Sequence, residues 1–230
     1  KIIFPENKII FLIDLINRFI PSYQEHIIYL KSVDYQMIKN EPDYKIRILG
    51  RIPIESTYPV SGAYDLLINT KSHFKFSDEE NHHGGKNLFD MGLNSKYKYI
   101  CFHARDKAYK NKINTEKDWS YHDFRDANIQ NYLPMAELFS KKGIHMIRMG
   151  SVVAEKLKTN NPKIIDYANK FQSEFMDFYL AANCQFFITG LTGACLLATF
   201  FRKPIIFINS VQIQTIGSWT KYDLFIPKKM

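Results

Sequence analysis

Between residues 97 and 209 the sequence alternates short β-branched or aromatic runs with segments of helical periodicity. This alternation is typical of βαβ units, in which helices cover a parallel sheet. We therefore expect an α/β fold with a Rossmann-like sheet of four or five parallel strands. The expected strands are 99–102, 144–147, 164–165, 186–188 and, as the closing strand, 204–208.

Helix start and stop signals lie between these strands. Gly143 follows an apolar-periodic segment over 133–139 and can supply a left-handed cap. Ser173 precedes Glu174 and predicts a helix start. A further small-residue helix is expected over 194–201.

The first 96 residues are less regular, and we read them as a partial N-terminal α/β region before a Rossmann-like domain over 97–230. Ile9–Ile20 and Glu25–Ile38 have helical periodicity, and Ile46–Ile54 favours an extended chain. Ser77 with Glu80 forms a capping box for a helix ending near Gly92.

Composition excludes several classes of protein. With 46% hydrophobic and 23% charged residues, the chain is too apolar to be disordered. Three cysteines cannot build a disulfide framework and favour a reducing, cytoplasmic compartment. The apolar runs are far shorter than the ~20 residues of a membrane span.

The net charge of +8 favours anionic partners: nucleotides, sugar phosphates, nucleic acid or an acidic lipid surface. Basic residues alternate with acidic ones, so a small anionic ligand is at least as plausible as a polymer. A basic nucleic-acid-binding module is the alternative from another class.

The first motif, His103, Arg105 and Asp106, directly follows the first predicted strand. In an open parallel sheet the ligand crevice lies beyond the carboxyl ends of the strands, so these side chains are placed at its mouth. Arginine presents a fork of donors that suits phosphate. The structural alternative is a loop salt bridge with a hydrogen-bonded histidine.

A second motif repeats these residue types in the long loop that follows, with His122, Arg125 and Asp126. Asp126 can equally cap a helix, and Arg125 can be a solvated surface charge.

Two further motifs end later strands. Arg148, Gly150 and Ser151 close the strand over 144–147, and an arginine there needs an anion, whether Asp166 or a ligand. A small-residue turn lies before the helix over 194–201, where backbone amides can meet a phosphate; its members are Thr189, Gly190, Thr192 and Gly193.

No metal motif is predicted. His82 and His83 lack a third ligand at a recognisable spacing, and no Asp-x-Asp occurs. We expect no cofactor. Glu174 and Asp177 read first as helix caps and second as contacts to a ribose or sugar hydroxyl.

Three stretches, YICFHARDKAY, WSYHDFRDANIQNYLPMAELFSKKGIHMIRMGS and KIIDYANKFQSEFMDFYLAANCQFFITGLTGACLLATFFRKPIIFIN, resemble a group of bacterial glycosyltransferases of surface-polysaccharide and glycan biosynthesis. The resemblance covers about residues 76–230. More loosely, the first motif and the small-residue turn are similar to the donor side of GT-B enzymes, including the fucosyltransferase-like branch.

The resemblance implies transfer of a sugar from a nucleotide-sugar donor to a glycan, lipid-linked or protein acceptor. It implies that arginines and helix N-terminal amides, rather than a metal, hold the donor phosphates. Leu191 departs from the pattern, because a small hydroxyl residue is expected there. Peripheral membrane contact at the inner face stays open, and no nucleic-acid partner is expected.

For such a transfer, we expect Arg105, Arg148 and the amides of the small-residue turn to neutralise the charge that develops on the leaving diphosphate. The donor-binding set also includes Arg125, Gly150 and Ser151. Whether the transfer inverts or retains the anomeric centre is left open; if it inverts, Asp106, His103 and His122, in that order, are the candidate bases for an acceptor hydroxyl. Asp126, Glu174 and Asp177 are candidate sugar or ribose contacts. A non-catalytic scaffold on the same fold is the second alternative.

Overall fold

A computed structural model describes residues 46–47, 53–54, 70–72, 74–94, 96–113, 115–116, 118–211 and 220–228. The helices expected over 9–20 and 25–38 lie outside these residues. Within the segment expected to be extended, β1 (Ile46–Arg47) and β2 (Pro53–Ile54) pair antiparallel.

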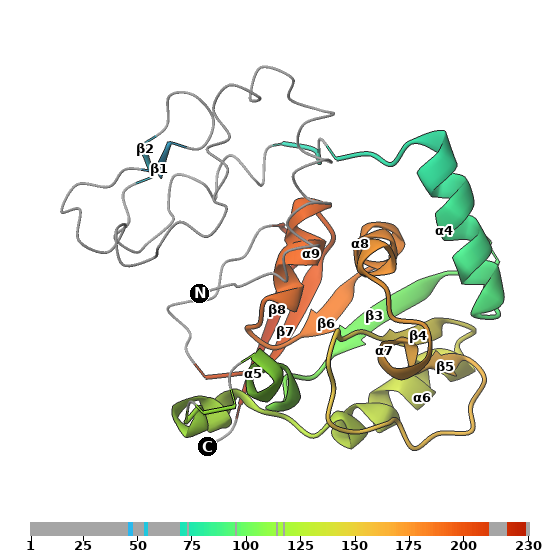
Figure 1. Cartoon of the computed structure of the whole chain (residues 1–230). Helices are drawn as coiled ribbons and strands as arrows, with labels where there is room; N and C mark the ends of the chain where they lie inside the picture. The colour runs from blue at the N-terminus through green and yellow to red at the C-terminus, as the bar shows by residue number, and fades with distance from the viewer. Residues whose placement is uncertain are drawn as a thin grey trace.

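Six parallel strands form one sheet in the order β5-β4-β3-β6-β7-β8 (Figure 1). This confirms the α/β, Rossmann-like prediction. The strands are β3 (Tyr99–His103), β4 (His145–Arg148), β5 (Ile164–Ile165), β6 (Phe187–Thr189), β7 (Ile205–Ser210) and β8 (Leu224–Pro227). The expected closing strand, β7, is followed by one more strand, β8. The sequence did not predict β8, because it is an edge strand whose exposed residues lack the signature of a buried strand.

The strand order reverses between β3 and β6. From β3 the chain builds β4 and β5 on one side, then returns to build β6, β7 and β8 on the other. In open parallel sheets the ligand crevice lies at such a reversal, beyond the carboxyl ends of the two strands, which here are β3 and β6.

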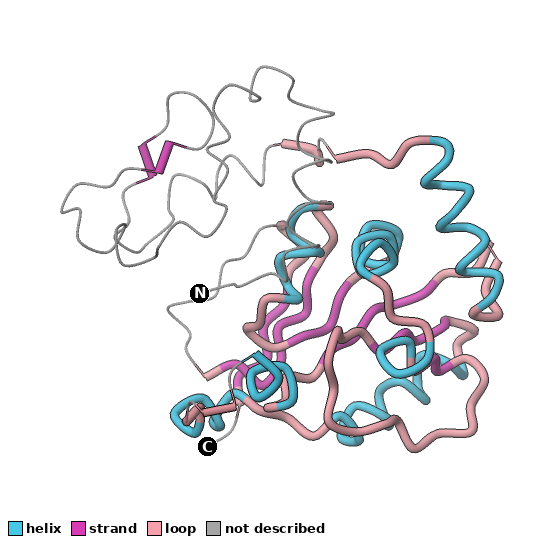
Figure 2. The backbone as a smooth tube through the Cα atoms, viewed as in Figure 1, coloured by secondary structure: helices cyan, strands magenta, loops and turns pink. Residues whose placement is uncertain are grey.

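Helices cover both faces of the sheet (Figures 1 and 2). One core lies under helices on the face that Tyr99 and Cys101 reach, and the other on the face of Ile100 and Phe102, as expected for a strand buried on both sides. The first face carries α4 (Asp78–Asp90), α7 (Tyr167–Lys170), α8 (Glu174–Asn183) and α9 (Ala194–Phe200), and the second carries η3 (Ile129–Tyr132) and α6 (Leu133–Lys141).

The helix boundaries follow the signals in the sequence. The Ser77–Glu80 capping box opens α4, and the Ser173 hydroxyl accepts the Met176 amide at the start of α8. Gly143 has φ +83°, so it supplies the left-handed residue after α6.

The segment between β3 and η3 is the long connection that the sequence predicts. It carries α5 (Ala108–Ile113) and the 3₁₀ helix η2 (Ser120–Arg125). Figure 1 shows α5 beside the carboxyl ends of the strands. The first and second motifs are thereby placed at the crevice.

Candidate functional site

The centre of the crevice is a pair of residues at the ends of its two strands. His103 ends β3, Thr189 ends β6, and the two are register partners. The Thr189 hydroxyl donates to the carbonyl of Gly190 at 3.1 Å and lies 3.4 Å from Nδ1 of His103. It also lies 3.4 Å from the Thr192 hydroxyl.

The Thr189 hydroxyl lies on the Nδ1 side of the His103 imidazole. A threonine hydroxyl has a single hydrogen, which Thr189 can give to the carbonyl of Gly190. In the tautomer in which Nδ1 of His103 donates to Thr189, Nε2 is an acceptor with no partner among the described residues.

The pKa of His103 is lowered from 6.5 to about 4, first because burial disfavours the imidazolium. Asp106 acts in the opposite direction, while Arg148 and Arg105 lower this pKa further. The ring is consequently neutral at pH 7.

Arg105 is held in place by other residues of the long connection between β3 and η3. Its guanidinium forms an ion pair with Asp126 and donates to the carbonyl of His122 at 3.1 Å. Burial, followed by the charge of Arg125, lowers the pKa of Arg105. The two arginines are thus close enough to repel each other, with Asp126 as the carboxylate that pairs with the first.

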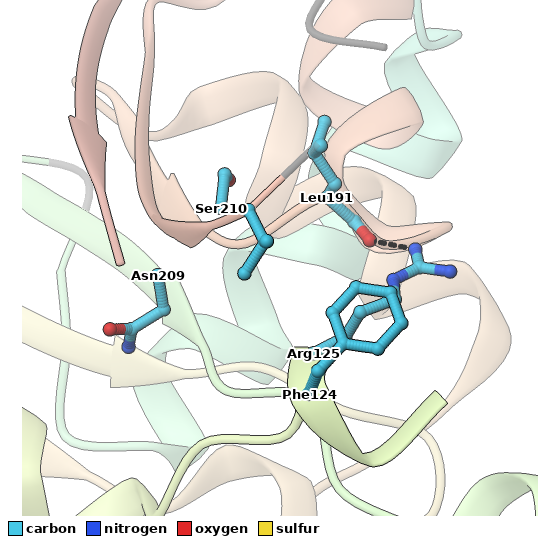
Figure 3. A pocket seen from close by; sticks show the side chains of 6 residues that line it. Phe124, Arg125, Leu191, Asn209 and Ser210 are labelled. Atoms are coloured by element: carbon cyan, nitrogen blue, oxygen red, sulfur yellow. Dashed lines mark hydrogen bonds between the residues drawn. The ribbon is translucent and has the colours of Figure 1, made fainter. Parts of the chain in front are cut away.

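Arg125 reaches across the crevice to the small-residue turn. Its Nη2 donates to the carbonyl of Leu191, and it lines a narrow hollow with room for about one water molecule. Figure 3 shows the guanidinium at Leu191, with Asn209 and Ser210 at the other side of the hollow. Among the residues that the structure describes, Arg125 forms no ion pair with a carboxylate.

The small-residue turn is packed tightly against the sheet. Thr189 is fully buried, and a Cβ on Gly190 would lie 3.3 Å from the carbonyl oxygen of Ile208. The Thr192 hydroxyl accepts the amide of Ala194, while Gly193 is exposed. Close packing therefore explains Gly190, and Thr192 and Gly193 remain at the crevice surface.

Asp106 acts as a link between loops. One carboxylate oxygen accepts the amide of Ala108 and the other that of Ala154, each at 2.9 Å. It thereby ties the connection after β3 to the loop after β4. Each of its oxygens thus accepts one backbone amide, whereas no described residue bonds Nε2 of His103.

His122 belongs to an aromatic cluster on η2. Its ring lies 4.0 Å from Tyr121 and 6.4 Å from Trp119, and the ammonium of Lys110 lies 4.4 Å from the Trp119 ring centroid. The carbonyl of His122, by contrast, holds Arg105. The structure thus gives His122 a role in shaping the connection.

Arg148 forms an internal ion pair with Asp166. This is the first of the two alternatives that the sequence left open, the other being a ligand. The side chain of Arg148 is 1% exposed and Nη1 lies 3.1 Å from Asp166. The other oxygen of Asp166 accepts the amide of Leu157 and the side-chain amide of Asn169. We therefore correct its assignment: Arg148 stabilises the β4 edge and is not available to a diphosphate.

Gly150 lies immediately beyond β4 and next to His103. Its φ of +153° favours glycine, and a Cβ there would lie 2.6 Å from Val153 and 3.9 Å from Cδ2 of His103. Ser151 follows as a half-buried residue of the same loop. The glycine therefore keeps the space beside the imidazole open.

The three candidate sugar contacts differ. Asp177 is 3% exposed and accepts hydrogen bonds from Tyr167 and Gln172, so it is corrected to a structural residue of α8. Glu174 is half-buried in the first turn of α8. Asp126 is the one that stands beside Arg105, and its Oδ2 is buried without a partner among the described residues.

Four residues of the hollow were not predicted: Phe124, Asn209, Ser210 and Val211. Asn209 has φ +54° and Ser210 follows a register shift in β7. Asparagine at the end of a buried strand was the available signal, because asparagine tolerates left-handed backbone and irregular strand ends gather at ligand sites.

Neither a metal cluster nor a membrane span is found in the described part of the chain. No three metal-binding side chains come together there, and His83 packs its ring 5.0 Å from that of Phe175. None of the described helices is sufficiently long and apolar to pass through a bilayer.

The fold and the crevice define an α/β protein with a candidate anion site at the switch point of a Rossmann-like sheet. No family model matches the chain, and no curated protein or solved structure does. The functional argument therefore rests on the geometry of the crevice.

Proposed function

We propose that this chain is a glycosyltransferase that moves a sugar from a nucleotide-sugar donor to a hydroxyl of a glycan, lipid-linked or protein acceptor. The observation that carries the proposal is the pair of neighbouring guanidinium groups of Arg105 and Arg125 at the switch point. A single carboxylate, that of Asp126, pairs with them among the described residues. The carboxylates of Asp123 and Asp106 also act on Arg105, so the positive charge left for a diphosphate is that of Arg125.

We assign the donor diphosphate to Arg125, together with Thr192 and Gly193 in the loop that follows β6. Arg125 already donates to Leu191 in that loop, so its remaining N–H groups stand over the turn. Charge that builds on the leaving diphosphate is neutralised by Arg125 and Arg105, which are held in place before the reaction. The proposal calls for no cofactor beyond the nucleotide sugar.

Asp126 is assigned to a hydroxyl of the donor. Its Oδ2 is a buried acceptor without a hydrogen bond, while its Oδ1 pairs with Arg105. A buried acceptor left unpaired costs about 1–3 kcal/mol, and a ribose or sugar hydroxyl would satisfy it.

His103 is assigned as the general base of an inverting transfer. The acceptor hydroxyl gives its proton to Nε2 as its oxygen bonds the anomeric carbon, and the bond to the diphosphate breaks. Thr189 holds Nδ1 and thereby the orientation of the ring. The same proposal places the reaction in the cytoplasm, since Cys101, Cys184 and Cys195 are all buried and unpaired.

The proposal is tested by thermal unfolding of the full chain with UDP, GDP, CDP, dTDP or ADP. A nucleotide that binds only the folded state raises Tm, and we expect at least one of the five to do so. Arg125→Ala is expected to weaken that nucleotide by at least about 10-fold, because a charge-assisted contact is lost.

The matched control is Arg202→Ala. Arg202 also donates to backbone carbonyls, those of Thr70, Thr199 and Phe200, but it follows α9, away from the crevice. Its variant should keep the nucleotide shift. No shift with any of the five nucleotides, or an equal shift in the Arg125→Ala variant, would overturn the proposed donor site.

A further inference from the structure

A second hollow lies along the free edge of the sheet, at β5. It has a volume of about 350 Å³, within the range of small-molecule sites. We call it the β5 groove; it is lined by Met91, Thr159, Asn160, Asn161, Pro162, Ile164, Ile165, Asp166, Lys170 and Phe171. β4 separates β5 from β3, so the groove is distinct from the crevice at the switch point.

The floor of the β5 groove is apolar. Ile164 belongs to one core of the sheet, and Ile165 and Met91 belong to the other, so the groove opens where the two cores meet. Phe171 follows α7 and packs into neither core; it is 38% exposed. An aromatic ring is therefore presented beside an aliphatic floor.

Most polar groups of the β5 groove are already occupied. The Thr159 hydroxyl accepts the Asn161 amide, and the Asn161 side chain donates to Glu137 and Ser140. Both oxygens of Asp166 accept hydrogen bonds as well.

Two exposed polar groups remain, the amide of Asn160 and the ammonium of Lys170, neither with a partner among the described residues. Because Arg148 neutralises Asp166, the ammonium of Lys170 is the charge that the groove presents. The hollow thus combines an aromatic ring, a free amide and one unmatched positive charge.

We propose that the β5 groove binds a saccharide unit that carries a carboxylate. The apolar face of the sugar ring packs on Phe171, ring hydroxyls bond the amide of Asn160, and the carboxylate pairs with Lys170. The charge and the aromatic ring come from the groove itself; the choice of a sugar over an acidic peptide rests on the proposed function.

The test titrates the full chain with three probes: a disaccharide of glucuronic acid and glucose, the neutral disaccharide cellobiose, and a hexapeptide of glutamate. Amide chemical shifts report where each probe binds. We expect the acidic disaccharide to bind more tightly than the other two and to shift the amides of Asn160, Lys170 and Phe171.

Phe171→Ala should weaken the acidic disaccharide by about 3- to 10-fold, because one aromatic contact is lost. Lys170→Gln should remove the preference for the acidic over the neutral disaccharide. The matched control is Phe89→Ala on α4, which deletes a ring that is 72% exposed and lies outside the groove; it should change nothing.

The proposal is overturned if the acidic disaccharide leaves the groove amides unshifted, if Phe171→Ala behaves like Phe89→Ala, or if the hexapeptide binds more tightly. The nucleotide-induced rise in Tm, measured on Phe171→Ala, separates this failure from failure of the donor site. That rise depends on Arg125 and is expected to survive the loss of Phe171.

Discussion

The imidazole of His103 shows how contacts from several elements decide the chemistry of one residue. β6 supplies the hydroxyl that holds Nδ1, and the loop after β4 supplies Gly150 beside the ring. Burial by these neighbours lowers the pKa of His103 to about 4. The same burial makes the stability of the fold depend on pH.

His103→Gln is expected to flatten that dependence. In the unfolded chain the imidazole takes up a proton near pH 6.5, but in the folded chain only near pH 4. The free energy of unfolding of the wild type therefore falls as pH drops from 6.5 to 4. Between pH 6.5 and 4, the free energy of unfolding of the variant should fall by up to about 3 kcal/mol less than that of the wild type, as measured by urea denaturation.

The comparison for this prediction is His83→Gln, since the side chain of His83 is exposed to water on α4. That variant should follow the wild-type curve. If the wild type and His103→Gln lose stability in parallel between pH 6.5 and 4, the prediction that burial keeps the imidazole of His103 neutral is wrong.

At the scale of elements, α4 joins the sheet layer through a close approach to α8. Leu88 of α4 lies in the same core as the residues of α8, and the Tyr179 hydroxyl donates to the carbonyl of Asn81. Gly84 lies against the Tyr179 ring, which Phe76 and Phe175 flank at centroid distances of 5.2 and 5.6 Å. The missing side chain of Gly84 is what lets the two helices meet.

Two adjacent glycines in α4 should therefore respond oppositely to alanine. Gly84→Ala drives a methyl group into the confined Tyr179 ring and should lower the free energy of unfolding by about 1–3 kcal/mol. Gly85 has open space around it, so Gly85→Ala should raise stability by up to about 1 kcal/mol through helix propensity. Urea denaturation of the two variants decides, and stabilisation by both would show that α4 does not pack as described.

At the scale of the whole molecule, the net charge of +8 and the location of the crevice bear on the same ligand. The crevice lies at the carboxyl edge of the sheet, where Arg105 and Arg125 meet, and Lys228 after β8 bonds the carbonyls of Phe124 and Asp126 nearby. An anionic ligand is therefore attracted both by the protein as a whole and by the site.

The association rate of the bound nucleoside diphosphate should fall several-fold as NaCl rises from about 0.02 to 0.5 M, because salt shortens the range of this attraction. The dissociation rate should change less, since the contacts inside the crevice are partly buried. Stopped-flow binding measures both rates. An association rate independent of salt would exclude electrostatic steering to the crevice.

Five of the six strands of the sheet, and helices α4, α6, α8 and α9, could be predicted from the sequence alone. Hydrophobic periodicity located β3, α6 and α8, and Ser173 and Gly143 mark the start of α8 and the end of α6, because these signals act between residues close in the chain. The sequence also placed the His103–Asp106 motif at the mouth of the crevice. The short edge strand β8 escaped, since exposed residues on an edge carry little periodicity.

Which polar groups already have a hydrogen-bond or ion-pair partner, and which can bind a ligand, depends on the tertiary structure. Arg148 and Arg125 look alike in the sequence, yet Arg148 pairs with Asp166, which follows β5, whereas the hydrogen bond of Arg125 among the described residues is to the carbonyl of Leu191. Asp106 accepts an amide 48 residues away, and His103 lies against a hydroxyl from β6. Such pairings join residues distant in the chain, so they follow from how the strands are ordered in the sheet and not from any local pattern.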